Sequence, residues 1–168
     1  MDEKAVQLGI WSVSASQPKR LTRANVAFER TLEDWIEHDP SLLVTGLSVV
    51  GRQVRLDAGV LDLLGIDVVG RWVVIELKRA NVRRDTVAQA LDYVACIEQL
   101  SAAQLRESVS AYLQQSGTDL ASFLNERHLS ESIFEPSERD IQVHVVGLGR
   151  DPHLQRVLDS MKRRGYDI

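Results

Sequence analysis

The chain has 168 residues, 44% of them hydrophobic, which is enough to bury one core without a disulfide or a structural metal. Its formal net charge of −4 argues against an indiscriminate binder of nucleic acids, and no run approaches the roughly 18 apolar residues of a membrane span. Cys96 is the single cysteine and the charged start at residues 2–4 is unlike a secretory signal, so we expect a cytoplasmic protein without a membrane partner.

Residues 1–24 are predicted to form an N-terminal arm or an edge strand, and residues 25–168 are predicted to form one domain. The domain begins with a helix that Thr22 or Asn25 caps and that the pair Asp39-Pro40 ends. The apolar side chains of this helix fall mostly on one face, which predicts that they pack against the core: Val26, Phe28, Leu32, Trp35 and Ile36.

Four short segments rich in β-branched residues follow, separated by Gly51, Ala58-Gly59 and Gly70, and they predict an antiparallel meander. The segments are residues 47–50, 53–56, 60–66 and 72–77. The last two are apolar on both faces, which indicates central strands covered on both sides.

Beyond Lys78 the hydrophobic period changes to that of a helix, whose core-facing stripe is predicted to hold Val87, Leu91, Val94 and Glu98. Residues 102–127 predict one or two further helices, with a break at Gly117 and Thr118 as the cap. A buried strand over residues 141–148 and a last helix starting at Asp151-Pro152 complete the chain. The predicted fold class is therefore α/β, a central mixed β-sheet flanked by helices.

Three charged residues stand out in the two central strands. If residues 68–70 form the loop between these strands, Asp62 lies directly opposite Glu76, and Lys78 shares the same face because side chains alternate along a strand. A one-residue slip of the register would separate the two acids. The arrangement therefore depends on the loop length.

Two neighbouring carboxylates offer the hard oxygen ligands that Mg²⁺ prefers, and the carbonyl of Leu77 adds a third oxygen. A metal there would polarise a phosphodiester and lower the pKa of a bound water, which Lys78 would orient or deprotonate. The alternative is an ordinary ion pair between Asp62 and Lys78. Against it, charged groups in such apolar strands are costly to desolvate unless they are paired or metal-bound.

The sequence resembles the NucS-type (EndoMS-type) endonuclease domain, a branch of the PD-(D/E)xK superfamily. The similarity covers roughly residues 25–168 and is weakest between residues 101 and 139. It is carried by residues 51–54, 61–67, 70–71, 73–79 and 89–94, with supporting likeness at residues 32–43 and 145–168. It implies a restriction endonuclease-like fold in which Asp62, Glu76 and Lys78 take the catalytic positions.

The resemblance also implies roles for residues outside the central pair of strands. Gln89 and Tyr93, one turn apart on the following helix, take supporting positions in the site, although an ordinary polar helix flank explains them as well. Glu33 corresponds to an acidic position that in some relatives helps to hold metal, whereas a plain surface glutamate is the alternative. The family's separate N-terminal domain has no counterpart in the two dozen residues before the first helix, so its specificity does not carry over.

These observations predict an endonuclease that hydrolyses DNA with Mg²⁺ or Mn²⁺, in DNA repair or in defence against foreign DNA. The segment from residue 71 to 84 carries five basic residues and one acid, and Arg79, Arg83 and Arg84 are expected to contact phosphates, with a solvated charged edge as the alternative. Cutting both strands would need a homodimer or a partner domain. The competing hypothesis is a catalytically silent nucleic-acid-binding or assembly module with the same fold.

Overall fold

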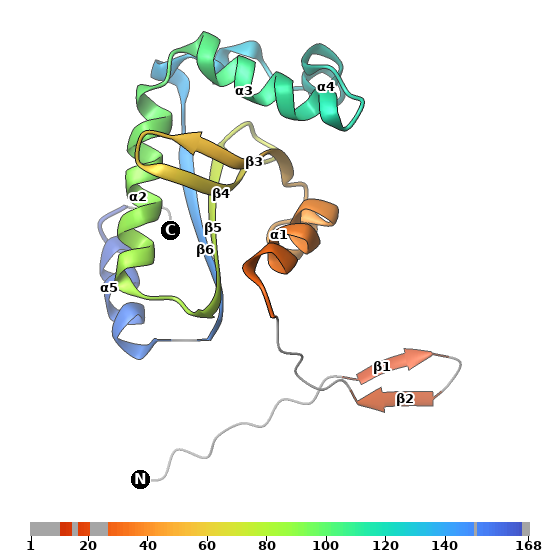
Figure 1. Cartoon of the computed structure of the whole chain (residues 1–168), viewed down its shortest axis with the longest axis vertical. Coiled ribbons are helices and arrows are strands. Elements are labelled where there is room, and N and C mark those ends of the chain that lie inside the picture. Colours follow the sequence, from red (N-terminus) through yellow and green to blue (C-terminus); the bar gives the residue numbers. More distant parts are fainter. Residues whose placement is uncertain (1–10, 15–16, 21–26, 150, 166–168) are drawn as a thin grey trace.

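The computed structural model describes residues 11–14, 17–20, 27–149 and 151–165, and its centre is a four-stranded mixed sheet with helices on both faces (Figure 1). The expected α/β class is confirmed. The elements of this domain are α1 (Glu29–His38), the 3₁₀ turn η1 (Pro40–Leu42), β3 (Ser48–Leu56), β4 (Gly59–Ile66), β5 (Trp72–Asn81), α2 (Arg84–Gln99), α3 (Ala102–Gln115), α4 (Leu120–Glu126), the 3₁₀ turns η2 (Glu131–Phe134) and η3 (Pro136–Glu138), β6 (Ile141–Gly149) and α5 (Pro152–Lys162).

A separate hairpin precedes the domain. The strands β1 (Trp11–Ser14) and β2 (Gln17–Arg20) pair with each other in antiparallel register and form a two-stranded sheet of their own. This hairpin lies within the predicted arm or edge strand of residues 1–24, of which residues 1–10, 15–16 and 21–24 lie outside the described part of the chain.

The central sheet has the order β3-β4-β5-β6. The first three strands form the expected antiparallel meander, and β6 runs parallel to β5 because α2, α3 and α4 carry the chain back across the sheet. One prediction was wrong: residues 47–50 and 53–56 are not two strands but parts of the single strand β3. The register shifts between Val49 and Gly51, so Gly51 follows a bulge in that strand and does not mark its end.

The sheet divides at its middle. β4 and β5 pair only from Leu63 opposite Ile75 to Ile66 opposite Trp72, which is the register that a three-residue loop predicts. Beyond Leu63 the strand β4 continues beside β3, while β5 continues beside β6, and Figure 1 shows the two pairs of strands running in different directions. Asp62 and Glu76 are the first residues beyond the last β4–β5 pair, at the point where the strands separate.

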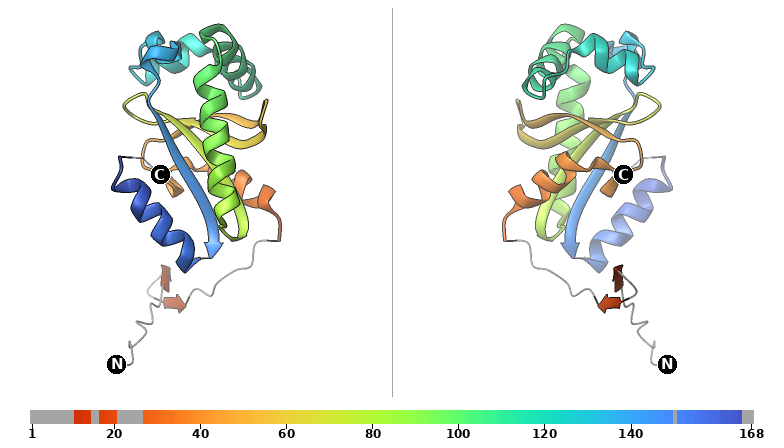
Figure 2. Two further views of the ribbon diagram at one scale, coloured as in Figure 1. Left: turned by 90° about the vertical axis from the view of Figure 1, so that its left-hand side faces the viewer. Right: turned by 90° about the vertical axis from the view of Figure 1, so that its right-hand side faces the viewer.

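Two apolar clusters lie on opposite faces of this sheet, and Figure 2 shows α1 and α2 on its two sides. The larger cluster joins β3, β4 and β5 to α2, α3 and α4, and it contains the fully buried Trp72 and Phe134 in edge-to-face contact. The smaller cluster packs Leu32 and Ile36 of α1 against Ile75. A third cluster holds α5 on the start of α2.

The buried faces of two helices differ from the predictions. In α2 the buried stripe holds Thr86, Ala90, Tyr93 and Ile97 together with Val87, so the stripe expected through Leu91 and Val94 was misplaced by about one residue. In α1 the side chains of Phe28 and Trp35 are 70% and 49% exposed, because only one narrow edge of the helix meets the sheet. Core packing of Trp35 was therefore a wrong prediction, whereas Trp72 is fully buried.

The helix ends largely follow the sequence. Asp39 ends α1 and caps η1 through Ser41, and Asp151 caps α5, as expected. The break between α3 and α4 occurs near Gly117, but Asp119 and not Thr118 caps α4. The expected caps Thr22 and Asn25, and Val26, lie outside the described residues. No helix in the described part is long and apolar enough to cross a membrane.

Candidate active site

Asp62, Glu76 and Lys78 meet where β4 and β5 separate. The Oδ2 atom of Asp62 accepts a 2.8 Å hydrogen bond from the backbone N–H of Leu77, so the side chain bridges the gap between the two strands. The Nζ atom of Lys78 donates to Oε1 of Glu76 at 2.7 Å. The expected proximity of the three residues is present, but the lysine pairs with Glu76 and not, as the alternative had it, with Asp62.

One carboxylate oxygen in this group has no partner. Glu76 is 1% exposed, and among the described residues nothing donates to its buried Oε2 atom. A buried acceptor without a hydrogen bond is costly, and a cation would satisfy it. The donor set of Asp62 and Glu76 therefore fits a small divalent metal.

The backbone adds to this donor set. In an extended strand the N–H and C=O of one residue point to the same side, and the N–H of Leu77 points at Asp62, so its carbonyl faces the same gap. Within the described part of the chain, no group of three or more His, Cys, Asp or Glu side chains is arranged as a metal site. A bound ion would thus rest on two carboxylates, a carbonyl and water, a set typical of Mg²⁺.

The burial and charges of this group favour the binding of a cation. Burial raises the pKa of Asp62 and of Glu76 above their usual values, and the hydrogen bonds from Leu77 and Lys78 only partly offset it. Burial alone would lower the pKa of Lys78, but the bond to Glu76 and the nearby charges outweigh it and raise that pKa. Lys78 is therefore a stable cation, and the two acids gain most from a positive charge.

Helix α1 contributes an acid that the sequence analysis missed. The charge of Glu29 raises the pKa of both Asp62 and Glu76, and its Oε1 atom accepts the backbone N–H of Arg79 at 3.3 Å. Glu33, the predicted acidic position, is occupied elsewhere: its buried Oε2 atom accepts Nε of Arg52 at 3.1 Å. Glu29 lies one turn earlier on the same helix, which is the only signal that the sequence offered.

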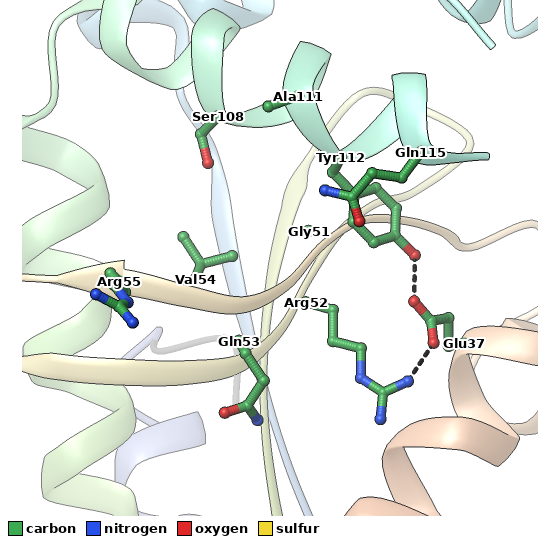
Figure 3. Close-up of a pocket in the computed structure, with 10 residues that line it drawn as sticks. All are labelled: Glu37, Gly51, Arg52, Gln53, Val54, Arg55, Ser108, Ala111, Tyr112 and Gln115. Atoms are coloured by element: carbon green, nitrogen blue, oxygen red, sulfur yellow. Dashed lines mark hydrogen bonds and ion pairs between the residues drawn. The ribbon is translucent and has the colours of Figure 1, made fainter. Parts of the chain in front are cut away.

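Arg52 fixes α1 to the sheet. Its guanidinium contacts the carboxylates of Glu33, Asp34 and Glu37, and Glu37 in turn accepts the hydroxyl of Tyr112 at 2.7 Å (Figure 3). The contact ties α1, β3 and α3 together beside a groove of about 470 Å³. It holds in place the helix that carries Glu29.

Gln53 connects that groove with the acidic group. It adopts the left-handed conformation, with φ of 49°, next to Arg52, and its Nε2 atom donates to Oδ1 of Asp62 at 3.3 Å. Its side chain also lines the groove in Figure 3. A non-glycine residue in this conformation is uncommon, and here it turns the side chain toward Asp62.

The structure gives Gln89 and Tyr93 partners of their own. Nε2 of Gln89 donates to the hydroxyl of Tyr93 at 2.7 Å, and this hydroxyl donates to the carbonyl of Val60 at 2.9 Å. Tyr93 is 1% exposed and belongs to the larger core cluster, so the expectation that it lies off the buried stripe was wrong. The Gln89–Tyr93 pair therefore contacts the backbone of β4 at Val60, two residues before Asp62.

The three arginines expected at phosphates occupy different surroundings. Arg79 turns toward α1, where its Nη1 atom donates to the carbonyl of Ala27 at 3.3 Å. Arg83 and Arg84 are exposed at the start of α2, and the guanidinium of Arg83 lies 3.7 Å from the exposed carboxylate of Asp85. Arg79 thus lies within β5 and turns toward α1, whereas Arg83 and Arg84 follow the end of β5.

Comparisons with known proteins identify the family and the fold. The sequence matches the family described as the endonuclease NucS C-terminal domain over residues 28–151. It is 35% identical over 78 residues to the endonuclease NucS of Methanopyrus kandleri and 32% identical over 66 residues to that of Methanocaldococcus jannaschii. These alignments cover 46% and 39% of this chain but only 30% and 25% of the two relatives.

A solved structure shares the fold. The protein in a structure described as an EndoMS–dsDNA2 complex is similar with a TM-score of 0.51 and 18% sequence identity, over 86% of this chain and 47% of that chain. At this identity the likeness concerns the fold alone, and it confirms the restriction endonuclease-like architecture. The chain thus spans about half the length of that protein, and its alignments span less than a third of each of the two curated relatives.

Proposed function

The chain belongs to the endonuclease NucS C-terminal domain family, and from this premise we propose that it is the catalytic part of a metal-dependent endonuclease that hydrolyses DNA phosphodiester bonds. One observation carries the proposal. At the fork between β4 and β5, the buried Oε2 atom of Glu76 has no partner among the described residues, while Lys78 holds the other oxygen of the same carboxylate. A cation bound at Oε2 would therefore lie beside a nucleophilic water oriented by Lys78.

Asp62, Glu76 and the carbonyl of Leu77 would hold Mg²⁺ or Mn²⁺. When bound, such an ion withdraws charge from the scissile phosphate and makes hydroxide available near neutral pH. The ammonium of Lys78, tied to Glu76, orients the attacking water and offsets the negative charge that develops on the phosphate oxygens. The water adds to phosphorus, the bond from phosphorus to the leaving oxygen breaks, and a proton passes to that oxygen.

The surrounding residues position this group. Gln53 orients Asp62 by a direct hydrogen bond, and Tyr93 with Gln89 anchors the stretch of β4 just before Asp62. Glu29 adds negative charge beside the two acids, which strengthens the attraction for a divalent ion. Because one such centre cuts one strand, cleavage of both strands requires a homodimer or a partner domain.

The proposal is tested by incubating supercoiled plasmid and labelled duplex, branched and single-stranded DNA with the purified protein, in Mg²⁺, Mn²⁺ or EDTA. The variants are Asp62→Asn, Glu76→Gln and Lys78→Ala. Asp57→Asn is the matched control, because Asp57 is an exposed acid in the turn between β3 and β4. We expect cleavage by wild type and by the control in Mg²⁺ or Mn²⁺ but not in EDTA.

The variants separate the two hypotheses. Loss of at least about a hundredfold in rate for each of the three site variants is the scale expected for groups that act in the transition state. If no DNA is cut under any condition while all proteins bind DNA equally, the domain is a silent binding module. Cleavage that survives in Asp62→Asn would move the catalytic centre away from the fork.

A further inference from the structure

Helix α5 packs against the start of α2. Val82, Val87 and Leu154 form a buried cluster in which Leu158 and Met161 of α5 are partly buried. Gly147 of β6 permits the close approach of Val82 to that strand, since a Cβ atom at residue 147 would lie 2.5 Å from a methyl group of Val82. The surface between α2 and α5 therefore has a fixed shape, and Figure 2 shows α5 alongside the β5–β6 pair.

A basic groove of about 410 Å³ lies on this surface. We define it by its lining residues, which include three arginines and, among the described residues, no carboxylate: Arg84, His153, Arg156, Val157, Ser160, Met161 and Arg164. The three arginines are exposed: Arg84 lies at the start of α2, Arg156 in α5 and Arg164 just after the end of α5. In a chain whose formal charge is −4, such a gathering is a marked departure from the average field.

The basic groove continues toward the catalytic fork. A neighbouring hollow of about 320 Å³ shares Arg84 and His153 with it and adds Arg83, Asp85 and Asp151. Arg83 directly precedes α2, and four residues separate it from Lys78 along β5 and its connection to α2. Arginines thus line the surface from the end of α5 to the connection that follows Lys78, with Asp85 and Asp151 as the acids that line the second hollow.

We propose that the basic groove between α2 and α5 binds the phosphate backbone of the DNA substrate outside the cleavage site. The inference rests on the proposed function, because it assigns a path to the same substrate. Guanidinium groups bind phosphates in bidentate geometry, and a row of them without carboxylates suits a uniform polyanion. An acidic protein is the other polyanion that suits a groove lined by arginines, and a competition experiment distinguishes it from DNA.

The test compares two double variants that remove the same charge from α5 and the residues directly after it. Arg156→Ala/Arg164→Ala alters the basic groove, whereas Lys162→Ala/Arg163→Ala removes two exposed cations at the end of α5 that line neither hollow. Fluorescence anisotropy of a labelled 30-base-pair duplex in EDTA, at several salt concentrations, gives affinity separately from hydrolysis. Circular dichroism melting confirms that each variant is folded.

We expect the groove variant to bind DNA severalfold more weakly and to lower the slope of log affinity against log salt by about 2, since each phosphate contact contributes about 0.9. The control pair should change both quantities much less. Equal effects of the two pairs would overturn the proposal, because the groove would then act only through net charge. Competition by polyglutamate as strong as by DNA would also overturn it, in favour of an acidic protein.

Cleavage assays distinguish this inference from the proposed function. The groove variant should raise KM in Mg²⁺ and leave kcat unchanged, because neither arginine approaches the carboxylates at the fork. A wild type that cuts DNA while the groove variant binds and cuts equally well overturns the inference alone. A wild type that binds DNA through the groove without cutting any substrate overturns the proposed function alone.

Discussion

The backbone N–H of Leu77 donates to Oδ2 of Asp62 at 2.8 Å across the gap between β5 and β4. Where β4 turns away, this amide loses its partner in the β4–β5 ladder, and a carboxylate replaces it. Asp62 therefore accepts the hydrogen bond of the Leu77 amide, and it also carries one of the negative charges of the candidate site. Substitutions can separate the two.

Asp62→Asn keeps an acceptor for Leu77 but removes the charge, and we expect it to raise the melting temperature of the metal-free protein at pH 7. Burial raises the pKa of Asp62 above its unfolded value, so the ionised form costs stability at a pH above the folded pKa. The gain should therefore vanish as the pH falls below the unfolded pKa of about 3.9. Calorimetry between about pH 3 and pH 8 measures it.

Asp62→Ala is the matched comparison. It removes the acceptor as well as the charge, so we expect it to be less stable than Asp62→Asn by about 1 kcal/mol, the net value of one hydrogen bond. Equal stability of the two variants would show that the bond to Leu77 contributes nothing to the fork.

Added Mg²⁺ or Mn²⁺ should reverse the order of stability. An ion that binds only the folded state raises stability in proportion to the logarithm of its concentration, about 2.7 kcal/mol at a hundred times its Kd. Wild type and the control Asp57→Asn should gain, and Asp62→Asn and Glu76→Gln should not. A gain shared by all four proteins would place the ion elsewhere in the chain.

The turn between β4 and β5 made the register of the site predictable. Asp67 accepts the backbone N–H groups of Val69 and Arg71 at 2.9 Å each, and Gly70 supplies the left-handed conformation with φ of 88°. Both residue types are typical of turns, and the loop has the length that the sequence analysis assumed, which gives the pairing of Leu63 with Ile75. The proximity of Asp62 and Glu76 followed from local chemistry.

Other parts of the site depend on contacts between distant segments. The ion pairs of Arg52 join β3 to α1, and nothing in either segment alone indicates them. Glu33 was assigned to the metal only through the resemblance, with a surface glutamate as the alternative, and neither reading includes its buried ion pair with Arg52. The bulge before Gly51 and the exposure of Trp35 likewise follow from how α1 meets the sheet, which the periodicity of one helix does not determine.

The Asp67 turn should make stability depend on pH. Burial alone would raise the pKa of Asp67, but the N–H groups and the guanidinium of Arg71 outweigh it and hold the pKa below its usual value. This contribution is present above the unfolded pKa and is lost as the pH falls through the folded one. Asp67→Asn should cost about 2 kcal/mol at pH 7, and urea titrations should find the difference shrinking toward pH 3. A difference independent of pH would contradict this assignment.

Arg52→Ala should destabilise the domain strongly. The change leaves Glu33, which is 6% exposed, without its cation, and removing one partner of a buried ion pair costs roughly 3 kcal/mol. Arg55→Ala is the control on the same strand, because Arg55 is exposed. Chemical denaturation of both variants tests this. A loss in Arg52→Ala no larger than in the control would mean that the ion pairs are balanced by their desolvation.

Tyr93→Phe should reduce catalysis as well as stability. The hydroxyl donates to the carbonyl of Val60, two residues before Asp62, so its loss frees the part of β4 that positions this acid. We expect about 1 kcal/mol of lost stability and about a tenfold lower kcat with unchanged KM, because small displacements of reacting groups are costly. Gln89→Ala keeps the bond to Val60 and removes only the donor to Tyr93, so its effects should be smaller in both measurements. A Tyr93→Phe protein with a lower melting temperature but a wild-type kcat would restrict the tyrosine to the core. A Gln89→Ala protein more impaired in kcat than Tyr93→Phe would instead indicate that the glutamine acts on the substrate directly.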